Sequence, residues 1–534
     1  MTVSVRAAMR DRPEAAAPVA KSELKQMVDK RVFHPVRADT LSDSERRGIL
    51  RSSMFMKDKF VASGAFDKYK ARLVAGGNTQ DKSLYEDLSA PTAATTSVLA
   101  VAAIAAKEGR TVLSIDIGGA FLNADIAPTG VDVHMRLDKL MTAMMVDITP
   151  AYKDYVGPDG CVVVKLDKAL YGCVEAASLW YADLTGNLKR GGFQQNPHDP
   201  CVFNRTGKCG RQITVVIHVD DLLVTSVSAV LIKELEDLLA AAYPETTTRS
   251  GKVIDYAGMT FDFETAVQVN VTMQHCTDDI LSGCGVTASY RTPATDELFN
   301  TRDSPKATDS ERVWFRSNVA KMLYLAKRVR PECLVAVAFL TTRVAVTDQD
   351  DLAKLRRVLG YLRSTRERGV TLRIGSEFTV RAYIDASYGV HNSGKSHTGC
   401  VIVIGEGGPV YCKSSKQKIV TKSSTEAELV ALSDSASQAL HVRLFLIAQG
   451  HEVGPAILHQ DNTSCMALVR RGGPSSERSR HISIRYFWVA ERVSMGEATV
   501  EHLGTEHMYA NLLTKPVQGA QFEQERAGVT HWMG

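Results

Sequence analysis

The chain has 534 residues, of which 44% are hydrophobic and 23% are charged, and its formal net charge is +4. This is the composition of a globular protein, long enough for roughly three or four domains. The longest apolar stretch, residues 98–106, is far shorter than the roughly 18 residues that a membrane span requires. These features exclude a membrane-spanning protein, and a net charge so close to zero indicates little about partners.

The cysteines and the N-terminus indicate the cell compartment. Ten cysteines are scattered along the chain without a CxxC pair or the Cys/His spacing of a zinc knuckle. The N-terminus lacks the pattern of a secretory signal peptide. We therefore expect reduced thiols in an intracellular protein of the cytoplasm or nucleus, which is not secreted and has no membrane partner.

The N-terminal part of the chain begins without a clear pattern and then gives strands. Residues 1–30 are rich in Ala and Arg without clear periodicity, and we expect a frayed or disordered lead-in there. Residues 51–78 predict two strands joined by a turn at Ser63 and Gly64. Residues 93–107 combine Thr and Ser capping residues with strong helix formers and predict a buried helix.

Helices and strands continue to alternate through residue 226. A strand ends near Asp116, and residues 162–190 predict a strand, a Tyr-Gly turn and a helix. Residues 210–226 predict two apolar strands around a Val-Asp-Asp turn. This alternation is typical of an α+β sheet domain.

The pattern changes twice in the second half of the chain. From about 310 to 365, apolar residues recur at three- and four-residue spacing, which predicts helices, and basic residues accompany them. Those basic residues fit either a phosphate backbone or a solvated helix face. After Gly375, three successive strands and a long helix predict a second, α/β domain.

Two adjacent aspartates, Asp220 and Asp221, stand between the apolar strands of "ITVVIHVDDLLVTS". Adjacent carboxylates repel each other and are costly to bury, so such a pair suggests a neutralising cation. Mg²⁺ prefers carboxylate oxygens and phosphates, and two such ions form the clamp used in nucleotidyl transfer. Asp116 is the candidate third acid. The alternative is an acidic turn in solvent, because Asp is common in turns.

Four motifs carry a resemblance to a known family. "HVDD" at 218–221 resembles the YVDD box of reverse transcriptases. The stretches "YKARLVAGGNTQ", "SIDIGGAFLNADI" and "LDKALYGCVEAASLWY" resemble the fingers and palm motifs of copia-type retrotransposon polyproteins. The resemblance implies a right-hand polymerase of fingers, palm and thumb, in which Asp116, Asp220 and Asp221 are catalytic residues that bind Mg²⁺ or Mn²⁺.

The resemblance also implies substrate-binding residues in the fingers and palm. Phe121 corresponds to the aromatic residue that packs under the incoming sugar and favours dNTPs; the alternative is an ordinary core aromatic. Lys70 and Arg72 lie on one strand face and suit a triphosphate. The alternative is a strand edge protected by basic residues.

Tyr171, Gly172 and His218 complete the implied substrate site. Tyr171 and Gly172 lie in a turn that borders the nucleotide in this family, where glycine permits close backbone approach. A simple strand-to-helix turn explains them equally well. His218 replaces the usual Tyr of the box, and its imidazole can still contact the end of the primer.

A second acidic trio lies in the C-terminal domain. Asp385, Glu428 and Asp461 resemble the acidic centre of RNase H, which uses two metal ions to cut RNA. Thr425 and Glu428 also have the spacing of a helix capping box, which is the structural alternative for Glu428. A box at Ser423 and Glu426 would leave Glu428 facing the metals.

Two positions depart from the family pattern in this domain. Copia-type chains close the site with an Asp in a motif like "ADILTKP", and "YANLLTKPV" has Asn511 in that place. Asparagine offers a carbonyl oxygen but no charge, so we expect RNA cleavage to be weaker or lost. Ser483 likewise stands where the family commonly has Asp.

These features predict an RNA-directed DNA polymerase of a copia-type element with an RNase H-like domain. Its partners would be an RNA or DNA template-primer duplex, dNTPs and other products of the polyprotein. The expected segments are a lead-in (1–30), the reverse transcriptase (31–300), a helical connection (301–375), the RNase H-like domain (376–520) and a tail (521–534). The alternative is a catalytically silent, nucleic-acid-binding remnant that keeps the fold.

Overall fold

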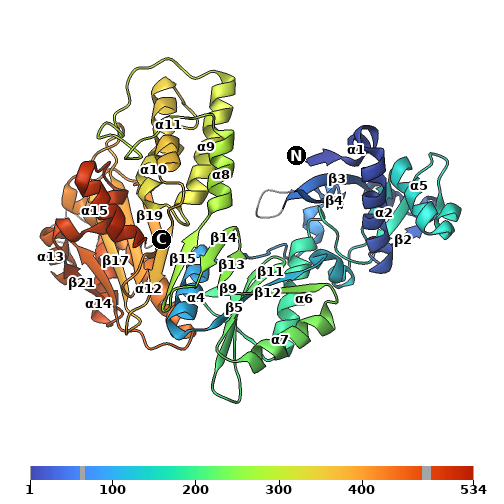
Figure 1. The fold of residues 1–534 in the computed structure, drawn as a ribbon, viewed down its shortest axis with the longest axis horizontal. Helices are drawn as coiled ribbons and strands as arrows, with labels where there is room; N and C mark the ends of the chain where they lie inside the picture. Colours follow the sequence, from blue (N-terminus) through green and yellow to red (C-terminus); the bar gives the residue numbers. More distant parts are fainter. Residues whose placement is uncertain (1, 61–65, 472–482, 533–534) are drawn as a thin grey trace.

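The structure is a computed structural model that describes residues 2–60, 66–471 and 483–532. Within these residues the strands form four sheets. Figure 1 shows the N-terminal lobe at one end, a central sheet below the middle, and a larger lobe of helices and a C-terminal sheet at the other end. In the described part, no helix combines the length and low polarity needed to cross a bilayer.

The N-terminal lobe is built on a six-stranded sheet. Its strands run in the order β1-β3-β6-β7-β2, and β4 pairs with β3. The predicted hairpin is confirmed because β3 and β4 are antiparallel neighbours; the turn predicted at Ser63 and Gly64 lies outside the described residues. The elements are β1 (Thr2–Ser4), α1 (Val5–Asp11), α2 (Pro13–Asp29), β2 (Phe33–Val36), α3 (Asp43–Arg47), β3 (Leu50–Phe60), β4 (Phe66–Ala75), β6 (His134–Leu137), α5 (Lys139–Ile148) and β7 (Val162–Leu166).

The expected disordered lead-in is wrong. Residues 5–29 form α1 and α2, and α2 buries Ala16, Ala20, Leu24 and Met27. These four residues are spaced by four, four and three positions, which places them on one helix face. Three of them are small or flexible side chains that give a weak hydrophobic signal. The helical spacing is thus present in the sequence, but its hydrophobic signal is weak. Packing on the sheet beneath α2 stabilises the helix.

The central sheet has the order β12-β5-β11-β10-β9-β8. Successive residues of its strands point to opposite faces, so one face packs with α6 and α7 and the other with α4. The predicted helix at 93–107 is α4, and the two predicted apolar strands are β10 and β11. The elements are α4 (Thr95–Glu108), β5 (Thr111–Ile117), α6 (Ala176–Arg190), β8 (Gln194–Asn196), β9 (Asp199–Thr206), β10 (Gln212–His218), β11 (Asp221–Ser226), α7 (Ala229–Ala242) and β12 (Thr246–Ser250).

A four-stranded sheet and a group of helices follow the central sheet. The strand order is β13-β14-β15-β16, and the helices lie between β15 and β16 along the chain. The helices predicted from 310 to 365 are confirmed as α9, α10 and α11. The elements are β13 (Val253–Tyr256), β14 (Met259–Asp262), β15 (Gln268–Thr272), α8 (Gln274–Gly283), α9 (Asp309–Ala326), α10 (Leu334–Thr341), α11 (Gln349–Ser364) and β16 (Val370–Arg373).

The C-terminal domain has a five-stranded mixed sheet in the order β19-β18-β17-β20-β21. Strands β17, β18 and β19 are antiparallel, whereas β20 and β21 continue the sheet in parallel. The three predicted strands and the long helix α12 are confirmed. The elements are β17 (Val380–Ser387), β18 (His397–Ile404), β19 (Pro409–Lys416), α12 (Ser424–Ala448), β20 (Ala456–Gln460), α13 (Thr463–Arg471), α14 (Ser483–Ser494), β21 (Ala498–His502) and α15 (Gly519–Thr530).

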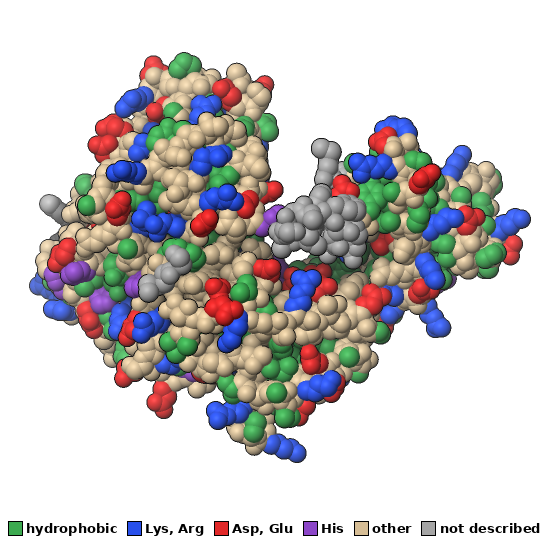
Figure 2. Space-filling view, viewed as in Figure 1, with side chains coloured by type: hydrophobic (Ala, Val, Ile, Leu, Met, Phe, Trp, Pro, Cys, Tyr) green, Lys and Arg blue, Asp and Glu red, His purple; other side chains and the backbone are tan. Residues whose placement is uncertain are grey.

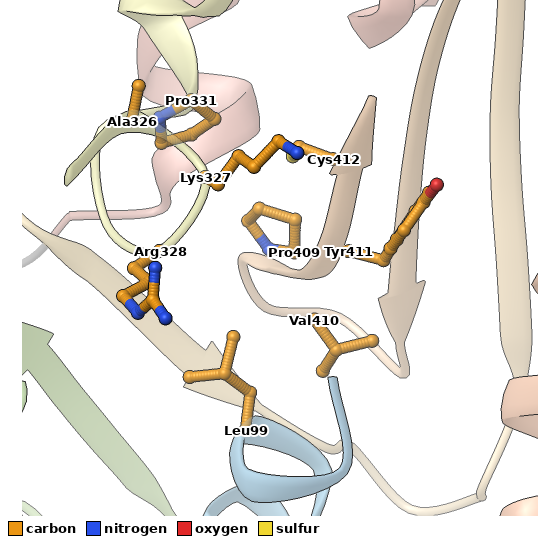
Figure 3. Close-up of a pocket in the computed structure, with 9 residues that line it drawn as sticks. All are labelled: Leu99, Ala326, Lys327, Arg328, Pro331, Pro409, Val410, Tyr411 and Cys412. Atoms are coloured by element: carbon orange, nitrogen blue, oxygen red, sulfur yellow. The ribbon is translucent and has the colours of Figure 1, made fainter. Parts of the chain in front are cut away.

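The C-terminal domain packs directly on the rest of the larger lobe. A single hydrophobic core contains residues of α4, the four-stranded sheet, the helices α9 to α11 and the C-terminal sheet. Figure 3 shows a crevice where α4, the end of α9 and β19 meet, with about 10 Å³ of free space. That is room for roughly one water molecule, so the junction is closely packed. The crevice is lined by Leu99, Ala326, Lys327, Arg328, Pro331, Pro409, Val410, Tyr411 and Cys412.

All ten cysteines are free. Seven of them are buried, where burial favours the uncharged thiol. Burial raises the pKa of the Cys173 and Cys201 thiols, for example, to about 12. The expectation of unpaired thiols agrees with this arrangement.

Two histidines are buried together beside the helices of the larger lobe. Nε2 of His391 lies 3.0 Å from Nδ1 of His397, and both rings contact Phe299. Burial lowers the pKa of His391 to about 4 and that of His397 to about 3. The pair therefore stays neutral in the folded protein well below pH 6.5.

Acid should destabilise the protein through this pair. The unfolded chain binds protons near pH 6.5 and the folded chain does not, so the free energy of unfolding falls as the pH drops from about 6.5 towards 4. At pH 5 the loss for His397 is about 2 kcal/mol. We expect His397→Gln to lessen the fall in Tm between pH 7.5 and pH 5. His507→Gln, at an exposed position, should behave like the wild type, and an unchanged pH dependence in His397→Gln would contradict the assignment.

Candidate active sites

The three predicted aspartates of the first half converge on one end of the central sheet. Strand β11 pairs with β5 so that Asp221 lies directly opposite Asp116. Asp220 stands in the turn between β10 and β11, and its carbonyl oxygen accepts a hydrogen bond of 3.1 Å from the Ile117 amide. Directly paired residues of antiparallel strands project to the same face. The structure therefore brings Asp116 and Asp221 side by side, with Asp220 adjacent.

The turn that carries Asp220 is held by a tryptophan from α6. Val219 has a φ of +61°, a left-handed conformation that is unfavourable for a β-branched residue. The Trp180 indole Nε1 donates a hydrogen bond of 2.7 Å to the Val219 carbonyl oxygen. Trp180 is 1% exposed and packs edge-on against Tyr243. The sequence interpretation missed this role, although Trp180 lies in the motif "LDKALYGCVEAASLWY".

A cavity of about 510 Å³ opens beside these acids. It contains Asp116 and Asp220 together with the predicted residues Lys70, Arg72 and Tyr171. Figure 2 shows the molecule hollowed between the N-terminal lobe and the larger lobe. The full lining is Phe55, Lys57, Lys70, Arg72, Val74, Asp116, Ile117, Gly118, Gly119, Tyr171 and Asp220. Acids of β5 and the β10–β11 turn thus face basic residues of the β3–β4 hairpin across one cavity.

The basic side of the cavity contains one more cation than predicted. Lys57 of β3 pairs directly with Lys70 of β4, and both side chains are exposed on the face that carries Arg72. The Arg72 guanidinium lies 4.0 Å from the centroid of the Tyr171 ring. The signal for Lys57 was available, because a hairpin centred on 63–64 places Lys57 and Lys70 opposite each other.

Glu23 of α2 lies beneath these cations. Its carboxylate accepts a hydrogen bond of 2.9 Å from the Leu73 amide. Burial raises the pKa of Glu23, while that hydrogen bond and the nearby Lys70 and Arg72 lower it. The helix that was expected to be disordered therefore supplies a group that faces the basic strand.

Phe121 and Gly172 lie behind the cavity lining. Phe121 packs edge-on against Tyr171, with ring centroids 5.0 Å apart, and does not itself line the cavity. Gly172 has a φ of +92°, and a Cβ there would lie 2.2 Å from the Ala75 carbonyl oxygen. The close backbone approach expected of this glycine is thus an approach to β4. Burial raises the pKa of Tyr171, and Arg72 lowers it.

His218 lies at the end of β10, across from Asp221. Its ring packs edge-on with Tyr256, whose hydroxyl donates to the Val216 carbonyl oxygen. Burial lowers the pKa of His218; Asp220 raises it and Arg328 lowers it. His218 therefore joins the aspartate turn to the β13 strand and lies near the end of α9.

Glu175 is used for packing. It is 1% exposed, and Oε2 accepts a hydrogen bond of 3.0 Å from Gln80. The Gln80 side-chain oxygen accepts in turn from the Val174 amide. Glu175 and Gln80 thus fasten the segment after β4 to the start of α6.

The three acids of the C-terminal domain form a tighter cluster. One carboxylate oxygen from each of Asp385, Glu428 and Asp461 lies within 4.8 Å of the others. Among the described residues, the aspartates of the central sheet do not meet this criterion. Asp385 is 1% exposed and Glu428 is 6% exposed. Hard carboxylate oxygens in this arrangement suit Mg²⁺ or Mn²⁺.

The cap of α12 settles the alternative for Glu428. The helix begins after Ser423, whose hydroxyl accepts from the Glu426 amide at 3.2 Å. Thr425 lies inside the helix, so Glu428 has no capping role. Burial and then the neighbouring Asp385 and Asp461 raise the pKa of Glu428 to about 9. A cation held by the cluster would offset this repulsion.

Asn511 lies beside this cluster, and both ends of its side-chain amide make hydrogen bonds. Its Nδ2 donates to the Thr505 carbonyl oxygen at 2.8 Å, and its Oδ1 accepts from Lys515 Nζ at 2.8 Å. Lys515 Nζ also lies 3.4 Å from the Asp385 carboxylate. Ser483 begins α14, but its side chain lies outside the described part of the chain.

Comparison with known proteins relates this chain and its fold to a known family. Residues 42–295 match the family model described as reverse transcriptase (RNA-dependent DNA polymerase). The chain is a homologue of copia-type retrotransposon Pol polyproteins. It is 28% identical over 473 residues to the retrovirus-related Pol polyprotein from transposon RE2 of Arabidopsis thaliana, an alignment that covers 87% of this chain and 31% of the relative.

Further relatives agree with this assignment. The retrovirus-related Pol polyprotein from transposon TNT 1-94 of Nicotiana tabacum is 25% identical over 466 residues, which cover 85% of this chain and 34% of the relative. The chain thus spans about a third of the length of these curated relatives. A foamy viral protease-reverse transcriptase, solved in complex with an RNA/DNA hybrid, matches 92% of this chain and 54% of its own with a TM-score of 0.50 and 11% identity. The predicted fold class, a right-hand polymerase with a C-terminal α/β domain, is confirmed.

Proposed function

We propose that the chain is an RNA-directed DNA polymerase of a copia-type retrotransposon, with an RNase H-like domain of reduced activity. The observation that carries the proposal is the register of β11 on β5, which places Asp221 opposite Asp116 next to the Asp220 turn. Asp116 and Asp220 line a cavity whose opposite wall is basic. A nucleotidyl-transfer site needs carboxylates that bind divalent cations and Lys or Arg side chains that bind phosphates.

Each group of residues has a role in this reaction. Asp116, Asp220 and Asp221 would hold Mg²⁺ or Mn²⁺. Two such ions supply a charge clamp for the attack of a primer 3′-hydroxyl on the α-phosphate of a dNTP. Lys70 and Arg72, with the newly recognised Lys57, would bind the triphosphate, and His218 would contact the primer end. Positioning of the two substrates is the protein's other contribution.

Template and primer would lie in the hollow between the two lobes. The foamy viral relative in fold was solved with an RNA/DNA hybrid, which supports a duplex as partner. Arg316 and Lys321 of α9, and Lys327 directly after it, are exposed and suit backbone phosphates. Binding would be independent of sequence and would weaken with salt. Other products of the polyprotein are the remaining proposed partners.

The proposed division into domains follows the expected segments. Residues 31–300 would form the reverse transcriptase, 301–375 a helical connection and 376–520 the RNase H-like domain. The described N-terminal helices extend the first domain towards residue 5, since α2 packs on β4. The segment expected as a tail contains α15, whose Phe522 is buried against Tyr361.

The direct test is extension of a DNA primer on a homopolymeric RNA template with purified protein. We expect extension that requires Mg²⁺ or Mn²⁺ and stops when the ion is chelated. Binding of the duplex without any extension, at every ion concentration, would contradict the polymerase.

Phe121 should control the choice of sugar. We expect Phe121→Val to raise incorporation of ribonucleotides relative to dNTPs by at least about tenfold, because a smaller side chain leaves room for the 2′-hydroxyl. Primer extension with rNTPs and with dNTPs measures this ratio of incorporation rates. Phe193→Val is the control, since Phe193 is a buried aromatic that packs against Arg205, whereas Phe121 packs against the cavity residue Tyr171. Equal selectivity in Phe121→Val and the wild type would make Phe121 a core aromatic only.

In the C-terminal domain, Asp385, Glu428 and Asp461 would hold the ions that cut the RNA strand of a hybrid. Their oxygens already lie within ligand-sharing distance. Asn511 brings no charge, and its carbonyl oxygen is occupied by Lys515. We therefore propose slow RNA cleavage beside an active polymerase.

A catalytically silent, nucleic-acid-binding remnant is the second candidate. Two observations favour it: Asn511 replaces an acid, and the oxygens of the three central-sheet aspartates do not converge within 4.8 Å in the described structure. A remnant would bind the duplex with the same salt dependence but extend no primer. The extension assay distinguishes the two.

A further inference from the structure

Lys515 lies within the acidic cluster of the C-terminal domain. Its Nζ is 3.4 Å from both oxygens of Asp385, whose side chain is 2% exposed, and it also donates to Asn511. Thr514, the preceding residue, donates its hydroxyl to the same carboxylate. The Lys515 side chain is 45% exposed, so a partly solvated ammonium group is paired with a buried carboxylate and offsets part of its charge.

A chain of hydrogen bonds holds this lysine in place. The Thr505 hydroxyl donates to Asp461 Oδ2 at 3.0 Å, and the Thr505 carbonyl oxygen accepts from Asn511 Nδ2. The amide orientation of Asn511 is set by that contact, so its Oδ1 must face Lys515. An aspartate at 511 would bring a carboxylate oxygen against the Thr505 carbonyl oxygen. The Asn side chain therefore links Asp461 to Lys515 and, through it, to Asp385.

The charges of the cluster determine how many ions it can accept. When a bound cation keeps all three carboxylates ionised, they carry three negative charges, which one divalent cation and the Lys515 ammonium balance. A second divalent cation would leave an excess of two positive charges in a buried site, which is costly. Glu525 also faces Lys515 and Asp385, but burial raises the pKa of its carboxyl group and disfavours the extra negative charge.

We propose that the Lys515 ammonium serves as a built-in cation of the C-terminal acidic cluster, so that the cluster takes up one divalent ion instead of two. This rests on the proposed metal-binding role of Asp385, Glu428 and Asp461. Position 511 and Lys515 act together: the amide orients the ammonium, and the ammonium replaces the charge of an ion. Lys515 is in this sense a positioning and charge-balancing residue, with no contact to substrate required.

The test counts ions in the full chain and is independent of RNA cleavage. The parent protein carries Asp220→Asn and Asp221→Asn, which remove ion binding at the central sheet. Mn²⁺ is titrated, and the free ion is measured by electron paramagnetic resonance. We expect one bound Mn²⁺, lost when Asp385→Asn is added. Two bound ions in the parent protein would overturn the proposal.

Variants of Lys515 separate its charge from its packing. Lys515→Met should tighten binding of the first Mn²⁺ at least about tenfold, because a positive charge near the ion is removed. Lys515→Arg keeps the charge and should leave the affinity within about twofold. The double variant Lys515→Met with Asn511→Asp should bind two ions. Equal Mn²⁺ affinity in the Met and Arg variants, with Tm values showing that both are folded, would contradict the proposal.

These outcomes are distinct from the outcome for the proposed function. One bound ion without cleavage of any hybrid would support the built-in cation and contradict the ribonuclease. Two bound ions together with cleavage of a hybrid would support the ribonuclease and contradict the built-in cation.

Discussion

Asp220→Asn should reduce Mg²⁺-dependent primer extension by at least about a thousandfold, because a lost metal ligand removes several kcal/mol of charge stabilisation in the transition state. Asp220 lies in the turn that Trp180 fixes and lines the cavity opposite Lys70 and Arg72. The substitution preserves shape and removes only charge. The measurement is the initial rate of extension on an RNA template at saturating dNTP.

A matched control is available on α7. Asp237 is an exposed acid paired with Lys233 on the helix surface, and surface pairs of this kind contribute little. Asp237→Asn should therefore retain the wild-type rate. If Asp220→Asn extended primers at a rate similar to that of Asp237→Asn, the polymerase site would have to lie elsewhere. Duplex binding should be similar in both variants.

Asn511→Asp should raise the rate at which RNA is cut in an RNA/DNA hybrid, by about ten- to a hundredfold. A fourth carboxylate increases the negative charge available to divalent cations in the cluster. The variant should also lose about 1 kcal/mol of stability, since the Asn511 donor to the Thr505 carbonyl oxygen disappears. The measurement is cleavage of a labelled RNA strand at several Mg²⁺ concentrations.

The control for this variant is Asn300→Asp, at an exposed asparagine outside the C-terminal domain. It adds the same charge to the chain without adding it to the cluster, so cleavage should stay at the wild-type rate. An unchanged rate in Asn511→Asp would show that position 511 does not limit the ribonuclease. The assignment of Asn511 as the fourth position would then be wrong.

The sequence predicted the acids because they belong to local patterns. Asp220 and Asp221 stand between two apolar strands, and alternation in a hairpin is a short-range property that a sequence shows directly. The sequence also showed that Glu428 need not cap the helix, because Ser423 and Glu426 have the spacing of a capping box. The helices of the larger lobe were predicted from the same kind of local periodicity.

The lead-in shows where local patterns fail. Ala16, Ala20, Leu24 and Met27 carry a weak hydrophobic signal, and α2 is stable because β3 and β4 lie beneath it. Glu23 reaches the basic strand only through that packing. Trp180 could not be assigned either, because its role depends on the left-handed Val219, a conformation that no residue pattern predicts.

By itself, the sequence determined the candidate residues for the chemistry: two groups of carboxylates, the basic β4 strand and the substitution at Asn511. Only the tertiary structure decided how those residues meet. The distances between their side chains depend on how strands and loops that are far apart along the chain pack together. Packing brought the β3–β4 hairpin to the cavity that Asp116 and Asp220 line, and it placed Lys515 beside the buried Asp385. The physical reason is that residue type sets charge and hydrogen-bonding capacity, whereas burial and register set how strongly each charge acts on its neighbours.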